Sequence, residues 1–235
     1  MKAVVLSAGR GERLSPLTDR LPKPLIPLRG MPLIEHVLGA FMDAGVTEFI
    51  VVTGYKGDLI RAHLQEKGLG VDITFVHNPD YTLGNASSLL CARDHLAGED
   101  WFLLSMSDHI IEPGIVEDAL RGLREEPLLC VDRDPRYLRD VEEATKVMVC
   151  EKGYIRDIGK ELPWWNGVDT GVFLLNTGIF DLMAEAETPP TLSDCMRRLI
   201  DEAYLRACDV SGRFWLDVDT WDDLGYARKV VARWS

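Results

Sequence analysis

Glycines and basic residues crowd one early segment, "LSAGRGERLSPLTDRLPKPLIPLRG" (6–30), which starts on an apolar stretch and ends before another. Gly9 and Gly11 lack side chains, so the backbone there can approach a ligand closely and turn N–H groups toward phosphate oxygens. Arg13 would add one full positive charge. Lys23 would add a second, held stiffly because a proline with fixed φ stands on each side of it. The segment therefore predicts a binding site for a phosphorylated ligand.

Two common phosphate-binding loops do not match this segment. The dinucleotide pattern G-x-G-x-x-G fails because Leu14 stands in the third glycine position and no helical pattern opens directly after the loop. A Walker A loop fails because no G-K-[ST] follows. A lone G-x-G is often only a turn, so the lysine framed by prolines is the feature that favours a binding loop.

Three aspartates could hold a divalent metal ion. Asp108 follows the apolar run in "LLSMSDHI", whereas Asp217 and Asp219 alternate in "FWLDVDTWDDLGYA". Side chains two apart on a strand share a face, so both late carboxylates could reach one metal. A single strand-end aspartate can equally be a turn residue, and His109 is expected to shape the pocket rather than bind the metal. Carboxylate oxygens suit Mg²⁺, which would neutralise a triphosphate.

Composition limits the classes of partner. The chain has 235 residues, 46% of them hydrophobic and 27% charged, which is typical of a globular protein. Its formal net charge of −12 would repel nucleic acid and anionic lipid. Without an apolar run that could span a bilayer, and without a signal peptide pattern, we expect a cytoplasmic protein with no membrane segment and no nucleic-acid partner.

Apolar runs alternate with helical patterns through the first 135 residues. We expect strands at 2–8, 48–54, 72–78, 101–108 and 128–134 and helices at 33–45, 58–68, 85–96 and 113–124. This order is typical of a Rossmann-like α/β fold, a mixed, mainly parallel sheet flanked by helices. In such sheets ligands bind beyond the carboxyl ends of the strands.

The second half of the chain is less regular. We expect strands at 146–153, 154–160, 167–177 and 208–218 and helices at 178–186, 191–207 and from 220 onward. Thr220, Asp222 and Asp223 fit the cap and first turn of that last helix. Because no linker or repeat interrupts the chain, a single domain spanning 1–235 is predicted.

The stretch "LSAGRGERLSPLTDRLPKPLIPLRGMPLIEH" closely resembles the signature of the sugar-1-phosphate nucleotidyltransferases, L-A-A-G-x-G-x-R-L-x-P-L-T followed by P-K-P. The order of elements also resembles that family over essentially the whole chain. The resemblance implies the nucleotide-diphospho-sugar transferase fold, with a nucleotide-binding half (1–135) and an acceptor-binding half (136–235). It also implies transfer of a nucleotidyl group from a nucleoside triphosphate to a phosphorylated sugar or polyol, with release of pyrophosphate.

The same resemblance implies roles for individual residues. The opening loop would bind the nucleotide through Leu6, Ala8, Gly9 and Gly11 and supply the catalytic cations Arg13 and Lys23. Asp108 matches the metal-binding aspartate of the family. Two family variants of the late motif remain open: W-L-D-x-G-T favours Asp217, and V/I-D-T-P-E-D-L favours Asp219.

The acceptor site would come from the second half of the chain. Lys160 in "YIRDIGKEL" matches the family lysine that contacts the sugar phosphate, although an exposed hairpin lysine is the simpler interpretation. "NGVDTGVFLL" resembles the acceptor-binding strand, in which Asp169 and Thr170 would bind hydroxyl groups and Gly171 would allow close approach.

Recognition of the base would fall to Asn78, Gly84, Asn85 and Ser87 in "HNPDYTLGNASSLLCA", which resembles the cytidylyl branch of the family. With "MSDHI", "VDTGVFLL" and "WLDVDT", the resemblance is greatest to the CTP:inositol-1-phosphate cytidylyltransferases. It implies that CTP and inositol 1-phosphate give CDP-inositol and pyrophosphate with Mg²⁺. In many members of that branch a membrane-embedded transferase is fused to this domain, and homo-oligomers are possible.

Two alternatives remain open. A hexose-1-phosphate or phosphocholine nucleotidyltransferase that uses another triphosphate would make similar demands on the site. A catalytically silent protein that senses nucleotides would belong to a different class. The joint presence of Arg13, Lys23, Asp108 and the late aspartate pair favours an enzyme, and pyrophosphate release would separate the two classes.

Overall fold

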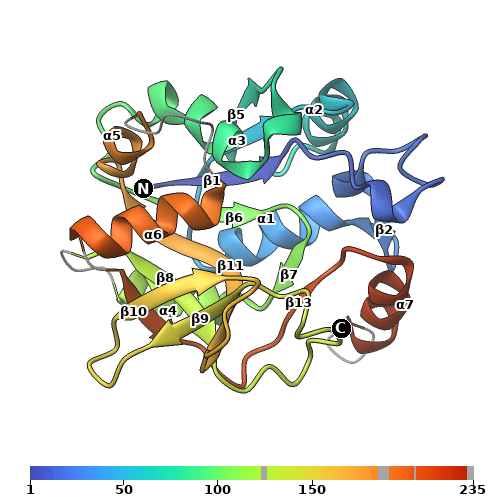
Figure 1. The fold of residues 1–235 in the computed structure, drawn as a ribbon. Helices are drawn as coiled ribbons and strands as arrows, with labels where there is room; N and C mark the ends of the chain where they lie inside the picture. Colours follow the sequence, from blue (N-terminus) through green and yellow to red (C-terminus); the bar gives the residue numbers. More distant parts are fainter. Residues whose placement is uncertain (123–125, 185–190, 204, 232–235) are drawn as a thin grey trace.

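A nine-stranded mixed, mainly parallel sheet forms the centre of the computed structural model, which describes residues 1–122, 126–184, 191–203 and 205–231 (Figure 1). The strand order is β10-β9-β11-β6-β1-β4-β5, and β8 joins at β11 with β12 beside it. The strands are β1 (Lys2–Ser7), β4 (Glu48–Thr53), β5 (Asp72–His77), β6 (Trp101–Met106), β8 (Leu128–Asp132), β9 (Lys146–Val149), β10 (Ile155–Gly159), β11 (Gly167–Asn176) and β12 (Arg206–Asp209). The predicted fold class is confirmed.

The sheet contains both parallel and antiparallel strand pairs, which come from different parts of the chain. β5, β4, β1 and β6 are parallel neighbours, and β12 is parallel to β8. β11 runs antiparallel to β6, β8 and β9, and β10 is antiparallel to β9. The first half of the chain therefore builds the parallel part of the sheet, and β11 connects that part to the second half.

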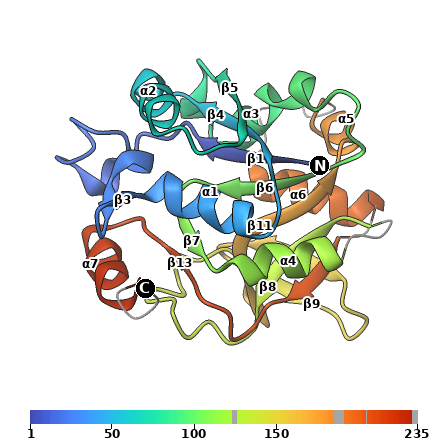
Figure 2. The same ribbon diagram turned by 180° about the vertical axis from the view of Figure 1, so that it is seen from behind.

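Helices cover both faces of the sheet because its buried strands alternate apolar side chains between the two sides. On β1, Val4 and Leu6 pack into one core cluster, whereas Ala3 and Val5 pack into the other. The first cluster lies under α3 (Asn85–Cys91), α5 (Ile179–Ala184) and α6 (Leu192–Ala203). The second lies under α1 (Leu33–Asp43), α2 (Gly57–Lys67) and α4 (Pro113–Arg121), which face the viewer in Figure 2.

A third, smaller core fixes the opening loop against the end of the chain. Leu14 from the loop packs with Phe214, Leu216 and Leu224. Leu216 lies in β13 (Trp215–Asp217) and Leu224 in α7 (Trp221–Val230). β13 pairs with β7 (His109–Ile111), and β2 (Pro27–Leu28) pairs with β3 (Met31–Pro32); β7 and β2 add Ile110 and Leu28 to the same core. At the start of α7, Thr220 and Asp223 form a reciprocal capping box, as their sequence pattern predicts.

Four predicted elements differ from the structure, among them the strand at 146–153, which ends at Val149. The single strand at 208–218 is wrong, since β12 and β13 belong to different sheets and a turn separates them. In that turn Gly212 has φ +86°, and the Asp209 carboxylate accepts from the Ser211 amide at 3.0 Å. The helix at 85–96 ends at Cys91 and continues as a short 3₁₀ turn, Arg93–Leu96. The helix at 191–207 ends at Ala203, because the chain enters β12 at Arg206.

Two other predicted helix ends, after Gly122 and after Ala184, lie outside the described residues. Within the described part of the chain, the structure contains no helix long and apolar enough to cross a membrane.

Candidate active site

Neighbouring strands bring the opening loop and Asp108 to the same edge of the sheet. Leu6 of β1 is paired with Met106 of β6, and the Ser107 amide donates to the Leu6 carbonyl at 3.0 Å. Both strands are parallel, so the segments that follow them start side by side. The pairing of β7 with β13 then sets Asp217 opposite His109. Residues more than 200 positions apart in the chain therefore meet at one point.

Lys23 lies at the centre of this group. Its Nζ is 2.5 Å from Asp108 Oδ2 and 2.5 Å from Asp219 Oδ1, and the residue is only 7% exposed. The lysine begins a 3₁₀ turn, Lys23–Leu25, and its side chain passes over Gly11. Gly11 has φ +68°, and a Cβ there would lie 2.9 Å from Lys23 Cβ. The glycine thus makes room for the lysine, which the sequence could not reveal.

The acidic neighbours keep Lys23 charged. Burial lowers the pKa of Lys23, but the charges of Asp108, Asp217 and Asp219 outweigh burial and raise it well above its usual range. Burial also raises the pKa of Asp219, yet Lys23 and Arg13 together lower it to about 2. Arg13 donates directly to the Asp219 carboxylate. Asp219 is therefore an anion at neutral pH.

A second group of ligand atoms lies beside this ion pair. Asp108, His109 and Asp217 each offer one atom, and the three atoms lie within 4.8 Å of one another. Within the described residues, Asp217 Oδ1 is buried and has no hydrogen-bond partner. Burial, with a contribution from the nearby Asp108 charge, raises the pKa of Asp217 to about 7, although His109 and Lys23 oppose the shift. An unpaired carboxylate oxygen facing a second carboxylate fits a divalent cation.

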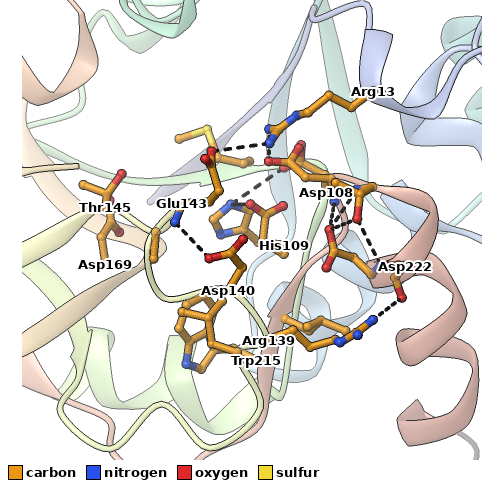
Figure 3. Close-up of a pocket in the computed structure, with 18 of the residues that line it drawn as sticks. Arg13, Asp108, His109, Arg139, Asp140, Glu143, Thr145, Asp169, Trp215 and Asp222 are labelled. Atoms are coloured by element: carbon orange, nitrogen blue, oxygen red, sulfur yellow. Dashed lines mark hydrogen bonds and ion pairs between the residues drawn. The ribbon is translucent and has the colours of Figure 1, made fainter. Parts of the chain in front are cut away.

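Adjoining cavities surround these residues. One of about 770 Å³ is lined by both halves of the chain (Figure 3), and one of about 400 Å³ is lined mainly by the opening loop. Arg13, Asp108 and Asp219 line both. Asn85, at the start of α3, lines these two and a third cavity of about 290 Å³ beneath α6. Eight Asp or Glu residues and three Arg or Lys residues line the 770 Å³ cavity, so a triphosphate there would need a metal cation.

The structure separates the predicted nucleotide-binding residues into two groups. Leu6, Gly9 and Gly11 line the 400 Å³ cavity, and Gly84 lines the 290 Å³ cavity. Ala8, Asn78 and Ser87 are not among the described residues that line the three cavities.

Asn78 has a structural position in this region. It is 1% exposed, and its side-chain amide donates to the hydroxyls of Ser87 and Ser88, each at 3.0 Å. The Ser87 hydroxyl in turn donates to the Gly84 carbonyl at 2.8 Å. This network holds the loop that carries Gly84 and Asn85, so Asn78 and Ser87 support the cavity wall. A direct contact between either of them and a nucleotide stays a prediction.

Of the three predicted acceptor-binding residues, two line a cavity and one is buried in the interior. Asp169 lines the 770 Å³ cavity, its Oδ1 accepts from the Gly171 amide at 2.7 Å, and burial raises its pKa to about 6. Lys160 lines the same cavity just after β10. Thr170 is fully buried, and its hydroxyl donates to the Cys130 carbonyl at 2.9 Å. Thr170 is not among the described residues that line the three cavities, and its contact with an acceptor hydroxyl stays a prediction.

Some cavity residues escape sequence reasoning. Glu143 lies with its Oε2 3.5 Å from Lys160 Nζ and 3.8 Å from an Arg13 nitrogen. Arg139, Asp140 and Thr145 of the same segment also line the cavity. The dense charges of "RDVEEAT" are the only signal for this segment, and a solvated loop gives the same pattern.

Several known proteins resemble the whole chain. It is 36% identical to the "Bifunctional IPC transferase and DIPP synthase" of Aquifex aeolicus over 98% of the chain, and 37% identical to the protein of the same name from Archaeoglobus fulgidus over 98%. The chain spans 52% and 44% of those relatives, about half of their length. The solved structure of the inositol-1-phosphate CTP transferase from T. maritima is similar with a TM-score of 0.87. In that comparison 27% of residues are identical, over 97% of this chain and 95% of the other.

A family model describes most of the sequence. Residues 3–203 match the MobA-like NTP transferase domain, a range that holds the opening loop, Asp108, His109 and Lys160. The nucleotidyltransferase family predicted from the opening loop is thereby confirmed, and nucleotide and sugar phosphate substrates and a divalent metal fit that family. The chain belongs to the MobA-like NTP transferase family.

Proposed function

We propose that this chain transfers the cytidylyl group of CTP to inositol 1-phosphate, giving CDP-inositol and pyrophosphate. The observation that carries the proposal is the position of the Lys23 ammonium, 2.5 Å from both Asp108 and Asp219, beside a glycine-rich loop at the carboxyl edge of the sheet. The choice of CTP and inositol 1-phosphate is supported by similarity to the T. maritima inositol-1-phosphate CTP transferase.

In the proposed reaction, a phosphate oxygen of inositol 1-phosphate attacks the α-phosphorus of CTP in line. A new P–O bond forms, the bond between the α-phosphorus and the bridging β-oxygen breaks, and pyrophosphate leaves with that electron pair. Catalysis then depends on placement and charge stabilisation, since no covalent intermediate is needed.

Each residue has a part in this scheme. Backbone amides near Gly9 and Gly11 approach the triphosphate, because these glycines line the cavity beside Lys23. Lys23 and Arg13 stabilise negative charge on the α-phosphate and on the leaving pyrophosphate. Lys160 binds the acceptor phosphate, and Asp169 accepts a hydrogen bond from an acceptor hydroxyl.

The metal in this proposal is Mg²⁺, held by Asp108 and Asp217, whose carboxylate oxygens approach each other within the three-residue group. Bound Mg²⁺ supplies charge neutralisation and orientation of the triphosphate oxygens. Asp219 differs from Asp217, since it is already paired with Lys23 and Arg13. Asp219 therefore positions the two cations.

Pyrophosphate release by the purified protein tests the proposal. With Mg²⁺, the protein is assayed with CTP, UTP, GTP, dTTP and ATP against inositol 1-phosphate, phosphocholine, glucose 1-phosphate and mannose 1-phosphate. We expect turnover with CTP and inositol 1-phosphate and a loss of kcat/KM of about 10²-fold or more for Lys23→Ala, the size typical for a lost charge-stabilising donor.

Arg10→Ala is the matched control, because Arg10 belongs to the same loop but pairs with exposed Glu12 and Asp19. It should keep near-normal kcat/KM, and circular dichroism should show that both variants are folded. Turnover with another pair would discard the proposed substrates. Triphosphate binding without any turnover would indicate a nucleotide sensor. A cytoplasmic location and a homo-oligomeric or fused state of the whole protein stay predictions.

A further inference from the structure

We infer that His109 supplies a nitrogen ligand to the metal ion held by Asp108 and Asp217, and that the site consequently binds Mn²⁺ more tightly than Mg²⁺. The inference rests on the metal site of the proposed function. It assigns a third protein ligand to that site and a reason for metal preference.

The hydrogen bond of the imidazole ring fixes its tautomer. Nδ1 of His109 lies 2.9 Å from the carbonyl oxygen of Thr170. A carbonyl oxygen only accepts hydrogen bonds, so Nδ1 carries the proton and Nε2 of the neutral ring has a free lone pair. This arrangement, in which a backbone carbonyl holds the far nitrogen, is typical of histidines that bind metals.

The free nitrogen faces the two carboxylates. Nε2 lies 3.9 Å from Asp108 Oδ1 and 3.8 Å from Asp217 Oδ2. Both distances are too long for a hydrogen bond. They leave the room that a cation needs between ligand atoms, and the unpaired Asp217 Oδ1 lies on the same side chain.

Lys23 does not compete for the same ligand atoms. Its ammonium contacts Asp108 Oδ2 and Asp219 Oδ1, whereas the oxygen of Asp108 that faces His109 is Oδ1. The two oxygens of Asp108 can thus serve the lysine and the metal at the same time. Asp219 pairs with Lys23 and Arg13, which leaves Asp217 to bind the metal.

The surroundings hold the ring in place before any ion arrives. Trp215 stacks on His109 with ring centroids 6.4 Å apart and an interplanar angle of 27°. Gly171 also contacts the ring: it has φ +78°, and a Cβ there would lie 2.1 Å from Nδ1. Only glycine leaves space for the imidazole at this bend of β11. Such fixed orientation lowers the cost of binding a metal.

A nitrogen ligand changes metal preference. Imidazole suits first-row transition metals, whereas Mg²⁺ is bound mainly by oxygen. A site of two carboxylates and one imidazole therefore favours Mn²⁺, while Mg²⁺ still binds through the oxygens.

Electron paramagnetic resonance of Mn²⁺ added to the full chain tests this directly. We expect Mn²⁺ to bind at least about tenfold more tightly than Mg²⁺, measured by competition. We also expect electron spin echo modulation from one directly bound nitrogen, which changes to the ¹⁵N pattern in protein labelled with ¹⁵N-histidine. His109→Gln should abolish the histidine modulation and most of the Mn²⁺ preference.

His36→Gln is the matched control, because the His36 ring contacts the Leu28 carbonyl and does not line the cavities among the described residues. It should leave affinity and modulation unchanged. Bound Mn²⁺ without histidine modulation in the wild-type protein overturns the inference even if His109→Gln fails to fold. So does equal affinity for Mn²⁺ and Mg²⁺. If the enzyme turns over CTP and inositol 1-phosphate but bound Mn²⁺ shows no nitrogen modulation, the role of His109 is wrong and the proposed function stands. If the modulation is present but no turnover occurs, the proposed function is wrong and the role of His109 stands.

Discussion

The Glu143 carboxylate lies between Arg13 and Lys160, the two basic side chains that we propose for phosphate binding. Its carboxylate lies near both Arg13 and Lys160, and all three side chains are about half exposed or more. Under the proposed function, a carboxylate there would compete with the acceptor phosphate for the same positive charges. Glu143 therefore partly neutralises the charges of Arg13 and Lys160.

Removing that charge should favour the acceptor. For Glu143→Gln we expect KM for the acceptor phosphate to fall about two- to tenfold, with the larger change at low ionic strength and a smaller change in kcat. Steady-state kinetics at two salt concentrations measures this. Glu161→Gln makes the same change of net charge beside Lys160 and should leave KM nearly unchanged. A rise of KM in Glu143→Gln would mean that Glu143 positions the cations instead.

The functional role of a single residue could be predicted where its immediate sequence neighbours indicate that role. Lys23 is framed by prolines and Asp108 ends a buried run, so the sequence alone singles out both. His109 gave no such signal, because its contact with Asp217 arises from the pairing of β7 with β13 across more than 100 residues. Thr170 matches the family's acceptor strand, and in the structure its hydroxyl donates to the Cys130 carbonyl, so its contact with an acceptor stays a prediction.

At the scale of elements, the position of Lys23 depends on the left-handed conformation of Gly11. Gly11→Ala would place a methyl group 2.9 Å from Lys23 Cβ at φ +68°. We expect a loss of about 1–3 kcal/mol in the free energy of unfolding, together with reduced kcat/KM as Lys23 moves. Chemical denaturation and steady-state kinetics measure the two effects.

Gly9→Ala is the matched comparison in the same loop. A Cβ at Gly9 meets nothing within 4 Å, so its effect on unfolding should stay within about 0.5 kcal/mol. Equal destabilisation by the two substitutions would show that general loop stiffness, and not the contact with Lys23, explains the effect.

Elements in the first half were predictable because βα alternation repeats there with clear apolar periods. The error at 208–218 arises where apolar patterning no longer separates two elements. β13 has only three residues, and both it and β12 contain apolar side chains, so the run looked continuous. Only tertiary pairing distinguishes them, since β12 pairs with β8 and β13 with β7.

At the scale of the whole molecule, a buried carboxylate with two partly exposed basic partners connects two helices. Glu35 of α1 is 6% exposed, and its carboxylate lies 2.7 Å from His63 Nε2 and 3.1 Å from Lys67 Nζ, both on α2. Burial raises the pKa of Glu35, but the hydrogen bonds from His63 and Lys67 outweigh burial and lower it below its ordinary 4.5. The native state thus binds this proton less readily than the unfolded chain.

Glu35 should therefore make stability depend on pH. Its contribution is present above about pH 4.5 and is lost as the pH falls through its lowered native pKa. Glu35→Gln should cost about 1–3 kcal/mol at pH 7 and less in acid. Urea unfolding at several pH values measures this, with exposed Glu48→Gln as control. An equal difference between Glu35→Gln and wild type at every pH would contradict the assignment.

One strand has a consequence for synthesis. β11 pairs with β6, β8 and β9. Among the strands that the structure describes, the other partner of β8 is β12, which follows β11 in the chain. The ribosome releases the amino-terminal half first, so β6 keeps an open edge and β8 has no neighbour until Gly167–Asn176 emerges. Unpaired edges recruit other chains. The nascent protein is consequently most exposed to aggregation in the interval between the completion of β8 and the arrival of β11.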